Sequence, residues 1–180
     1  AADRYLVSNI NGGPLDVDDN GYIAAIAPDG TVTNAKWIDG ATADVKLNAP
    51  KGMAIVGTTL YVADITVVHK FDTATGKLIG DVAIDTFNLP TDLTLDENGA
   101  ISVADNGNKR LQVFAPDGTF LAQFTGEEAG IPRFGSEGGS IASVESGGNG
   151  YLYVTDYARD DLLNGDQRLI KFRITLPGEP

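Results

Sequence analysis

The chain has 180 residues, a formal net charge of −12 and a pI of about 4.3, which argues against nucleic acid and anionic membrane surfaces as partners. It has no cysteine, so disulfides and thiolate chemistry are excluded. No apolar run approaches the roughly 20 residues that a membrane-spanning helix needs.

In chain order, one short pattern recurs four times: a central Val followed two residues later by Asn or Asp. The segments are YLVSNI (5–10), LYVADI (60–65), ISVADN (101–106) and LYVTDY (152–157). A second apolar segment follows each of them, and in three repeats a glycine turn and a further strand come next. Another short apolar strand precedes the last three, opening at Pro50, at Pro90 and near Gly139. Four short strands in about 40 to 50 residues are the period of a β-propeller blade.

The sequence therefore predicts an all-β fold, a β-propeller built from four repeats of four-stranded antiparallel blades. We expect one domain over residues 1–180, with repeats at approximately 1–47, 48–87, 88–131 and 132–180. The first blade lacks the strand before Tyr5 and the last blade lacks a strand after Ile174, so both are incomplete. Three interpretations stay open: a small four-bladed ring, self-association with a second copy to complete a larger ring, or a truncated or engineered assembly of blades.

The third repeat resembles an NHL repeat over its whole length. The matching residues are Pro90, Asp96, Gly99, Val103, Asp105, Asn108, Arg110, Gln112, Val113, Phe114, Asp117 and Gly118. The second repeat and the opening YLVSNINGGPLDVDDNGYIAAIAPDG look more like propellers of the gluconolactonase and regucalcin (senescence-marker) family.

That second resemblance implies a calcium-dependent lactonase with one divalent cation at the mouth of the central channel. The sequence departs from this pattern, because Lys51 and Thr91 stand where a carboxylate ligand is expected. His69 is the single histidine and is expected to be a partly exposed strand residue, so a histidine-based triad lacks support. The sequence leans against an enzyme, with a metal-dependent, lactonase-like hydrolase as the alternative.

The aligned Asn9, Asp64, Asp105 and Asp156 have two interpretations. Each carboxylate can accept backbone N–H bonds in the following turn and stabilise its blade. Alternatively, the four side chains form a ring of ligands for a cation or a polar molecule at the channel mouth. Asn48 and Asn88, each two residues before a blade-opening proline, are expected to line the same mouth.

The stretch GPLDVDDNGYI resembles the start of a calcium loop, with Asp16, Asp18 and Asn20 as candidate Ca²⁺ ligands. The closing ligand is missing, because Ala27 stands at the twelfth position of an EF-hand frame and Ala24 at the ninth position of a shorter frame. The stretch is therefore interpreted first as an extended hairpin connection. No cofactor is certain, and Ca²⁺ is the one that the sequence suggests.

Two further acidic segments are candidate binding loops. They carry Glu127, Glu128, Arg133 and Glu137 in the first, and Asp160, Asp161 and Asp166 in the second. Carboxylates on such loops also allow a phosphoesterase with bridging calcium ions, but no basic phosphate clamp can be assigned.

The leading functional hypothesis is a binding or scaffold module without a recognisable catalytic site. Its expected partner is a small polar ligand or another protein. A chain that begins AADRY without Met fits a mature extracellular or periplasmic form. The alternatives are the lactonase-type hydrolase and a truncated or engineered propeller without native function.

Overall fold

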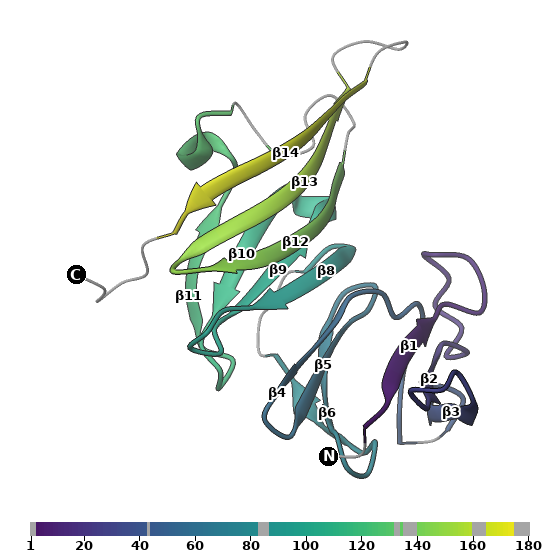
Figure 1. The fold of residues 1–180 in the computed structure, drawn as a ribbon. Helices are drawn as coiled ribbons and strands as arrows, with labels where there is room; N and C mark the ends of the chain where they lie inside the picture. The colour runs from purple at the N-terminus through teal and green to yellow at the C-terminus, as the bar shows by residue number, and fades with distance from the viewer. Residues whose placement is uncertain are drawn as a thin grey trace. The chain divides into compact units, whose positions relative to one another are not determined.

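The computed structural model describes residues 3–42, 44–82, 87–131, 134, 140–159 and 165–174. Within these residues it contains fourteen strands in four antiparallel sheets, together with the short 3-10 helices η1 (Asn106–Asn108) and η2 (Glu127–Ala129) (Figure 1). The sheets have three, four, four and three strands. The prediction of an all-β, incomplete propeller is confirmed. None of the helices in the described part is long and apolar enough to cross a membrane.

The chain divides into two compact units, residues 1–82 and 83–180. The division falls close to the predicted boundary between the second and third repeats, and the assignment of both units to one domain stays a prediction. Each unit holds two sheets, and each is described separately.

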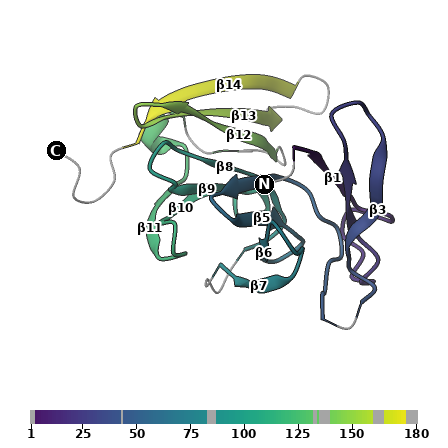
Figure 2. The same ribbon diagram turned by 60° about the horizontal axis from the view of Figure 1, so that its bottom comes forward.

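The first unit carries sheets 1 and 2. Sheet 1 has the order β1 (Tyr5–Asn9), β2 (Tyr22–Ile26) and β3 (Val32–Asp39). Sheet 2 has the order β4 (Met53–Val56), β5 (Thr59–Ala63), β6 (Val68–Asp72) and β7 (Leu78–Asp81). Figure 2 shows β1 and β3 on the two sides of their sheet.

The second unit carries sheets 3 and 4. Sheet 3 has the order β8 (Pro90–Leu95), β9 (Ile101–Asp105), β10 (Arg110–Phe114) and β11 (Phe120–Phe124). Sheet 4 has the order β12 (Ser140–Gly148), β13 (Tyr151–Arg159) and β14 (Gly165–Arg173).

The alternation of apolar residues along the strands builds one core in each unit. In the first unit, Ile23 and Ile38 of sheet 1 pack with Leu60, Val62 and Phe71 of sheet 2. In the second unit, a second cluster joins buried residues of sheets 3 and 4, among them Leu111, Val113, Leu152 and Val154. The short turns between strands supply the expected positive φ, as at Gly30 (φ 88°) and Gly118 (φ 95°) of the two PDG turns.

The strand registers make the four sheets equivalent. In each sheet the central Val of the pattern pairs with one residue of the next strand. The pairs are Val7 with Ala24, Val62 with His69, Val103 with Gln112 and Val154 with Ile170. Strand β1 therefore corresponds to β5, and β12 corresponds to β4. It follows that sheet 1 has no described counterpart of β4, and sheet 4 has no described counterpart of β7.

Candidate functional site

Asp64 lies at the end of β5 with its side chain fully buried. Its Oδ2 accepts the backbone N–H of Asn48 at 2.8 Å, and its Oδ1 accepts those of Ala49 at 2.7 Å and Ile65 at 2.8 Å. Two of these three donors belong to the segment before β4, not to the following turn. Asp64 therefore ties the entrance of the inner strand to the second strand of the same sheet.

Asp105 and Asp156 occupy the same position in sheets 3 and 4 and are also buried. Asp105 Oδ1 accepts the N–H of Asn88 at 2.8 Å, and its Oδ2 accepts Arg110 Nε at 2.8 Å and Asn108 Nδ2 at 2.8 Å. The guanidinium of Arg168 donates to Asp156 Oδ2 from the corresponding position of β14. Each carboxylate is thus paired with an arginine, as a buried charge requires.

Asn9 stands at the same position of sheet 1 but makes different contacts. Its Nδ2 donates to the carbonyl oxygen of Val7 at 2.9 Å. In the strand register Asn9 pairs with Tyr22, whereas Asp105 of sheet 3 pairs with Arg110. An amide carries no charge, so it needs no cation beside it. For Asp64 and Asp105, these contacts are those of a blade-stabilising role; ligand binding by the four aligned residues stays a prediction.

His69 is buried, with 6% of its surface exposed, where a partly exposed side chain was expected. Its Nδ1 lies 2.7 Å from Asp81 Oδ1, and its Nε2 lies 3.7 Å from Asp64 Oδ2, close enough for an ion pair but too far for a hydrogen bond. Burial by itself lowers the pKa of His69, but the carboxylates of Asp64 and Asp81 outweigh it and raise the pKa above 6.5. Burial likewise raises the pKa of Asp64, and His69 with the three backbone N–H groups outweighs it and lowers the pKa below 3.8.

The two predicted mouth residues, Asn48 and Asn88, contact protein backbone. Asn48 Oδ1 accepts the N–H of Asp19 at 3.0 Å, which fastens the long connection between β1 and β2. The carbonyl oxygen of Asn88 accepts the N–H of Gly107 at 2.7 Å, and a Cβ on Gly107 would lie only 2.4 Å from Asn88 Cγ. Their role at a channel mouth stays a prediction.

The predicted calcium ligands lie together in the connection between β1 and β2. Asp16 Oδ2 accepts the N–H of Gly13 at 2.8 Å, and Asp18 Oδ2 accepts Asn20 Nδ2 at 2.6 Å. Within the described residues, no group of three or more His, Cys, Asp or Glu side chains has the arrangement of a metal site. Ca²⁺ binding by Asp16, Asp18 and Asn20 stays a prediction.

The two acidic loops are described only in part. Glu128 Oε2 accepts the N–H groups of Thr125 and Gly126 at 3.0 and 3.1 Å, so this side chain fixes the entry to η2. Arg133, Glu137, Asp160 and Asp161 lie outside the described residues, and so does the side chain of Asp166.

The inner strands β8 and β12 lie side by side in the second unit and are joined by side chains that the sequence did not single out. Asp92 Oδ2 accepts the N–H of Val144 at 3.1 Å, and Thr94 Oγ1 accepts that of Ser146 at 3.1 Å. Burial raises the pKa of Asp92. The alternating polar residues of β8 indicate that one face of this strand makes polar contacts, but they do not identify β12 as the partner strand.

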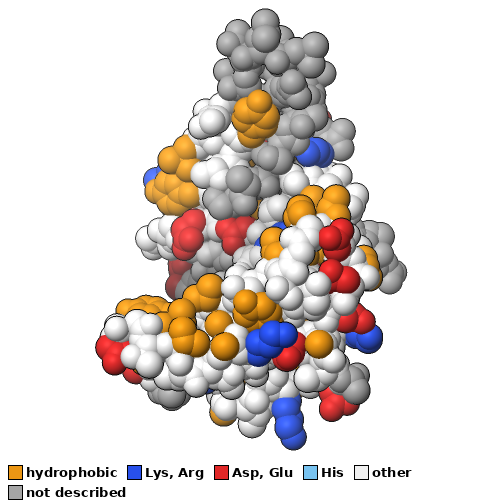
Figure 3. Space-filling model, turned by 90° about the vertical axis from the view of Figure 1, so that its right-hand side faces the viewer, with side chains coloured by type: hydrophobic (Ala, Val, Ile, Leu, Met, Phe, Trp, Pro, Cys, Tyr) orange, Lys and Arg blue, Asp and Glu red, His pale blue; other side chains and the backbone are white. Residues whose placement is uncertain are grey.

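Among the described strands, β1 has a free edge in sheet 1, beside a cleft. The cleft has a volume of about 340 Å³ and is lined by Arg4, by the start of β1 and by the β4–β5 hairpin: Arg4, Tyr5, Leu6, Met53, Ala54, Ile55 and Leu60. Tyr5 is 62% exposed, Val7 40% and Ile55 52%. Figure 3 shows exposed hydrophobic side chains gathering in patches between charged ones.

The comparisons with known proteins agree with this architecture. Residues 87–114 match the family model of the NHL repeat, within the repeat where the resemblance was seen. A luciferin-regenerating enzyme has a similar structure, with a TM-score of 0.63 and 17% identity over 97% of this chain and 60% of that one. A gluconolactonase from Xanthomonas campestris matches with a TM-score of 0.51 and 19% identity over 76% of this chain and 42% of that one.

A virginiamycin B lyase from Staphylococcus aureus matches with a TM-score of 0.54 and 14% identity over 86% of this chain and 49% of that one. This chain therefore spans between 42 and 60% of these three structures. No curated protein matches it significantly in sequence. At such low identity the similarity shows the fold alone: the chain is a β-propeller module that contains an NHL repeat.

Proposed function

We propose that this propeller module binds protein, by adding an extended segment of another polypeptide to the free edge of β1. The observation that carries this proposal is the difference between sheets 1 and 2. Strand β5 has β4 on one side and β6 on the other, whereas its equivalent β1 has a neighbour on one side only among the described strands. An edge strand presents unpaired N–H and C=O groups to any strand that can approach it.

The composition of β1 favours such pairing. Its sequence YLVSN has no charge and no proline, and its register with β2 has no bulge. Natural edge strands avoid pairing by means of charged residues, prolines and bulges, and β1 has none of these. The adjoining cleft offers apolar side chains to alternate residues of an incoming strand.

Asn9 supports the same proposal. Asp64 and Asp105 accept N–H groups from the segments that lead into β4 and β8. Asn9 occupies the corresponding position in sheet 1, where its side-chain oxygen would accept an N–H group of the incoming segment.

The test has two measurements. The first is binding of a peptide with the sequence of residues 88–96, which opens the third repeat, and the second is the native mass of the chain, which detects a dimer. Calorimetric titration should show binding of the peptide, and Val7→Lys should weaken it because a charge is placed on the free edge. Val32→Lys, on the opposite edge of the same sheet and 56% exposed, is the matched control and should bind as the native chain does. Equal affinity of the two variants, or no binding by the native chain, would disprove strand addition at β1. A dimer that Val7→Lys dissociates would identify a second copy as the occupant.

The alternative, calcium-dependent lactone hydrolysis, is tested by titrating Ca²⁺ into the protein calorimetrically and screening lactones for hydrolysis. Turnover that requires Ca²⁺ would replace the proposal of a binding module. Export from the cell, expected from the sequence, also stays a prediction.

A further inference from the structure

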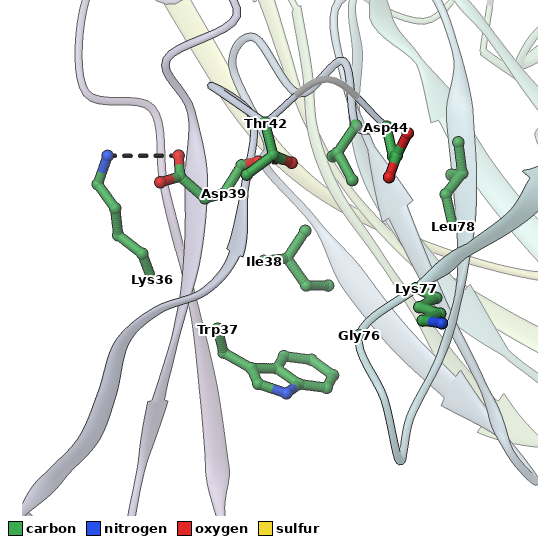
Figure 4. Close-up of a pocket in the computed structure, with 10 residues that line it drawn as sticks. Lys36, Trp37, Ile38, Asp39, Thr42, Asp44, Gly76, Lys77 and Leu78 are labelled. Carbon is green, nitrogen blue, oxygen red and sulfur yellow. Dashed lines mark hydrogen bonds and ion pairs between the residues drawn. The ribbon is translucent and has the colours of Figure 1, made fainter.

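A second cavity in the first unit lies apart from the edge of β1. It has a volume of about 530 Å³, which is within the range of small-molecule sites, and it opens between β3, the loop residues Thr42, Asp44 and Val45, and the turn before β7 (Figure 4). An apolar floor and charged residues line it, among them Trp37, Ile38, Val45, Leu78, Asp44 and Lys77.

The wall of this cavity is held in place without a ligand. Gly76 has a φ of 71°, and a Cβ there would lie 3.2 Å from Trp37 Cε2 and 3.3 Å from Ile38 Cγ1, so glycine lets the turn approach the indole. On Trp37, the guanidinium carbon of Arg4 lies 4.1 Å from the ring centroid, and the same group donates to the carbonyl oxygen of Thr73 at 2.7 Å. Because this wall is already ordered, binding of a ligand would cost less conformational entropy than binding to a mobile wall.

The charged groups of the lining differ in what they contact. Lys36 Nζ and Asp39 Oδ1 lie 3.3 Å apart and neutralise each other. Asp44 and Lys77 are exposed, and neither side chain has a hydrogen-bond or ion-pair partner in the described part of the chain. Asp44 belongs to the loop that follows β3 and Lys77 to the turn before β7, so one negative and one positive group come from different segments of the lining (Figure 4).

From this arrangement we infer that the cavity binds a short zwitterionic peptide with apolar side chains. Its ammonium group pairs with Asp44, its carboxylate with Lys77, and its side chains cover the apolar floor. Because both charges stand beside an apolar floor, the ligand carries apolar side chains as well as its two charged ends, as a dipeptide of apolar residues does. The inference does not rest on strand addition, since none of the lining residues belongs to β1.

Trp37 is the single tryptophan of the chain, so its fluorescence reports on this wall. Titration of the full chain with the dipeptide Leu-Leu should give a saturable change in fluorescence and a matching calorimetric isotherm. N-acetylated Leu-Leu lacks the ammonium group and Leu-Leu amide lacks the carboxylate. Each should bind about two- to fivefold more weakly, the effect of one solvent-exposed ion pair.

The variants Asp44→Asn and Lys77→Gln show which end of the peptide each of the two residues binds. Asp44→Asn should weaken binding of Leu-Leu but leave binding of the N-acetylated peptide unchanged, and Lys77→Gln should do the same for the amide. Asp19→Asn and Lys171→Gln change the net charge equally at residues outside the lining and should bind as the native chain does.

No saturable signal, or equal affinity of the native chain and both cavity variants for Leu-Leu, would overturn the inference. Thermal unfolding confirms that each variant is folded. Val7→Lys should bind Leu-Leu normally, so that failure of this inference and failure of strand addition are separate outcomes.

Discussion

Sheets 2 and 3 place an aspartate at the same position and neutralise it with different residues. In sheet 3 the partner of Asp105 is Arg110, which lies directly opposite it in the register. In sheet 2 the position of Arg110 is occupied by Val67, whose carbonyl oxygen accepts the N–H of Asp64. The positive charge comes instead from His69, two residues further along β6, which Asp81 contacts from β7.

This difference shows that the repeat requires a positive charge near the aspartate without fixing which residue supplies it. A carboxylate fully removed from water is stable only when it is hydrogen-bonded and paired. Arginine keeps its charge at every relevant pH, whereas histidine loses it near neutrality. The aspartate of sheet 2 is therefore expected to lose its paired positive charge as the pH rises through the pKa of His69.

The largest expected effect is on sheet 3. Asp105→Ala removes the carboxylate that accepts from Arg110 Nε and from the N–H of Asn88, and should lower the free energy of unfolding by about 3 kcal/mol. Urea denaturation followed by circular dichroism measures this change. This loss lies at the lower end of the range for buried pairs because the Arg110 side chain is 19% exposed. A decrease in the free energy of unfolding of less than about 1 kcal/mol would contradict the role of Asp105 as a buried acceptor of these hydrogen bonds.

A smaller and pH-dependent effect is expected in sheet 2. His69→Gln introduces the residue that sheet 3 carries at this position, Gln112, and removes the charge between Asp64 and Asp81. Because folding raises the pKa of His69, its contribution is fully present below pH 6.5 and is lost as the pH rises through the folded pKa. The native chain should exceed the variant by about 1–2 kcal/mol at pH 6 and approach it at higher pH.

The measurement is the difference in free energy of unfolding between native chain and variant, from urea curves between pH 5.5 and 9. A difference that does not fall with rising pH would contradict the assigned role of His69. Adding Val67→Arg to His69→Gln places the arginine of sheet 3 in sheet 2. This double variant should recover stability without the dependence on pH.

The smallest effect is expected where sheet 2 contacts the connection between β1 and β2. Asn48→Ala removes the acceptor of the Asp19 N–H and should cost about 1 kcal/mol, the net value of one hydrogen bond. Hydrogen exchange at the Asp19 amide should become faster. Unchanged exchange at that amide would show that the hydrogen bond does not hold the connection in place.

Most of the fold could be predicted from the sequence because its signals are local. The Val-x-Asp pattern, the prolines at 50 and 90 and the glycine turns occur within each repeat, so they identify the strands and their order. The repeat pattern also predicts that sheets 1 and 4 have one strand fewer than sheets 2 and 3, as the described strands show.

The chemistry of the sites was less accessible, because it depends on contacts between segments distant in sequence. The equivalents Gln112 and Ile170 suggested that His69 was a partly exposed residue, and only the register of β6 with β7 brings Asp81 to it. The cavity beside Trp37 is formed by β3, a loop and the turn before β7, none of which carries a recognisable motif. The sequence pattern suggested donors in the adjacent turn, where Ile65 lies, but the other two donors to Asp64 lie 15 and 16 residues earlier in the chain.

The uncharged edge of β1 has a consequence for the behaviour of the purified protein. If two molecules pair through this strand, association stabilises the folded state by mass action, so the melting temperature rises with protein concentration. Dilution would then lower the thermal stability of the chain in the same buffer, and Val7→Lys would make it independent of concentration.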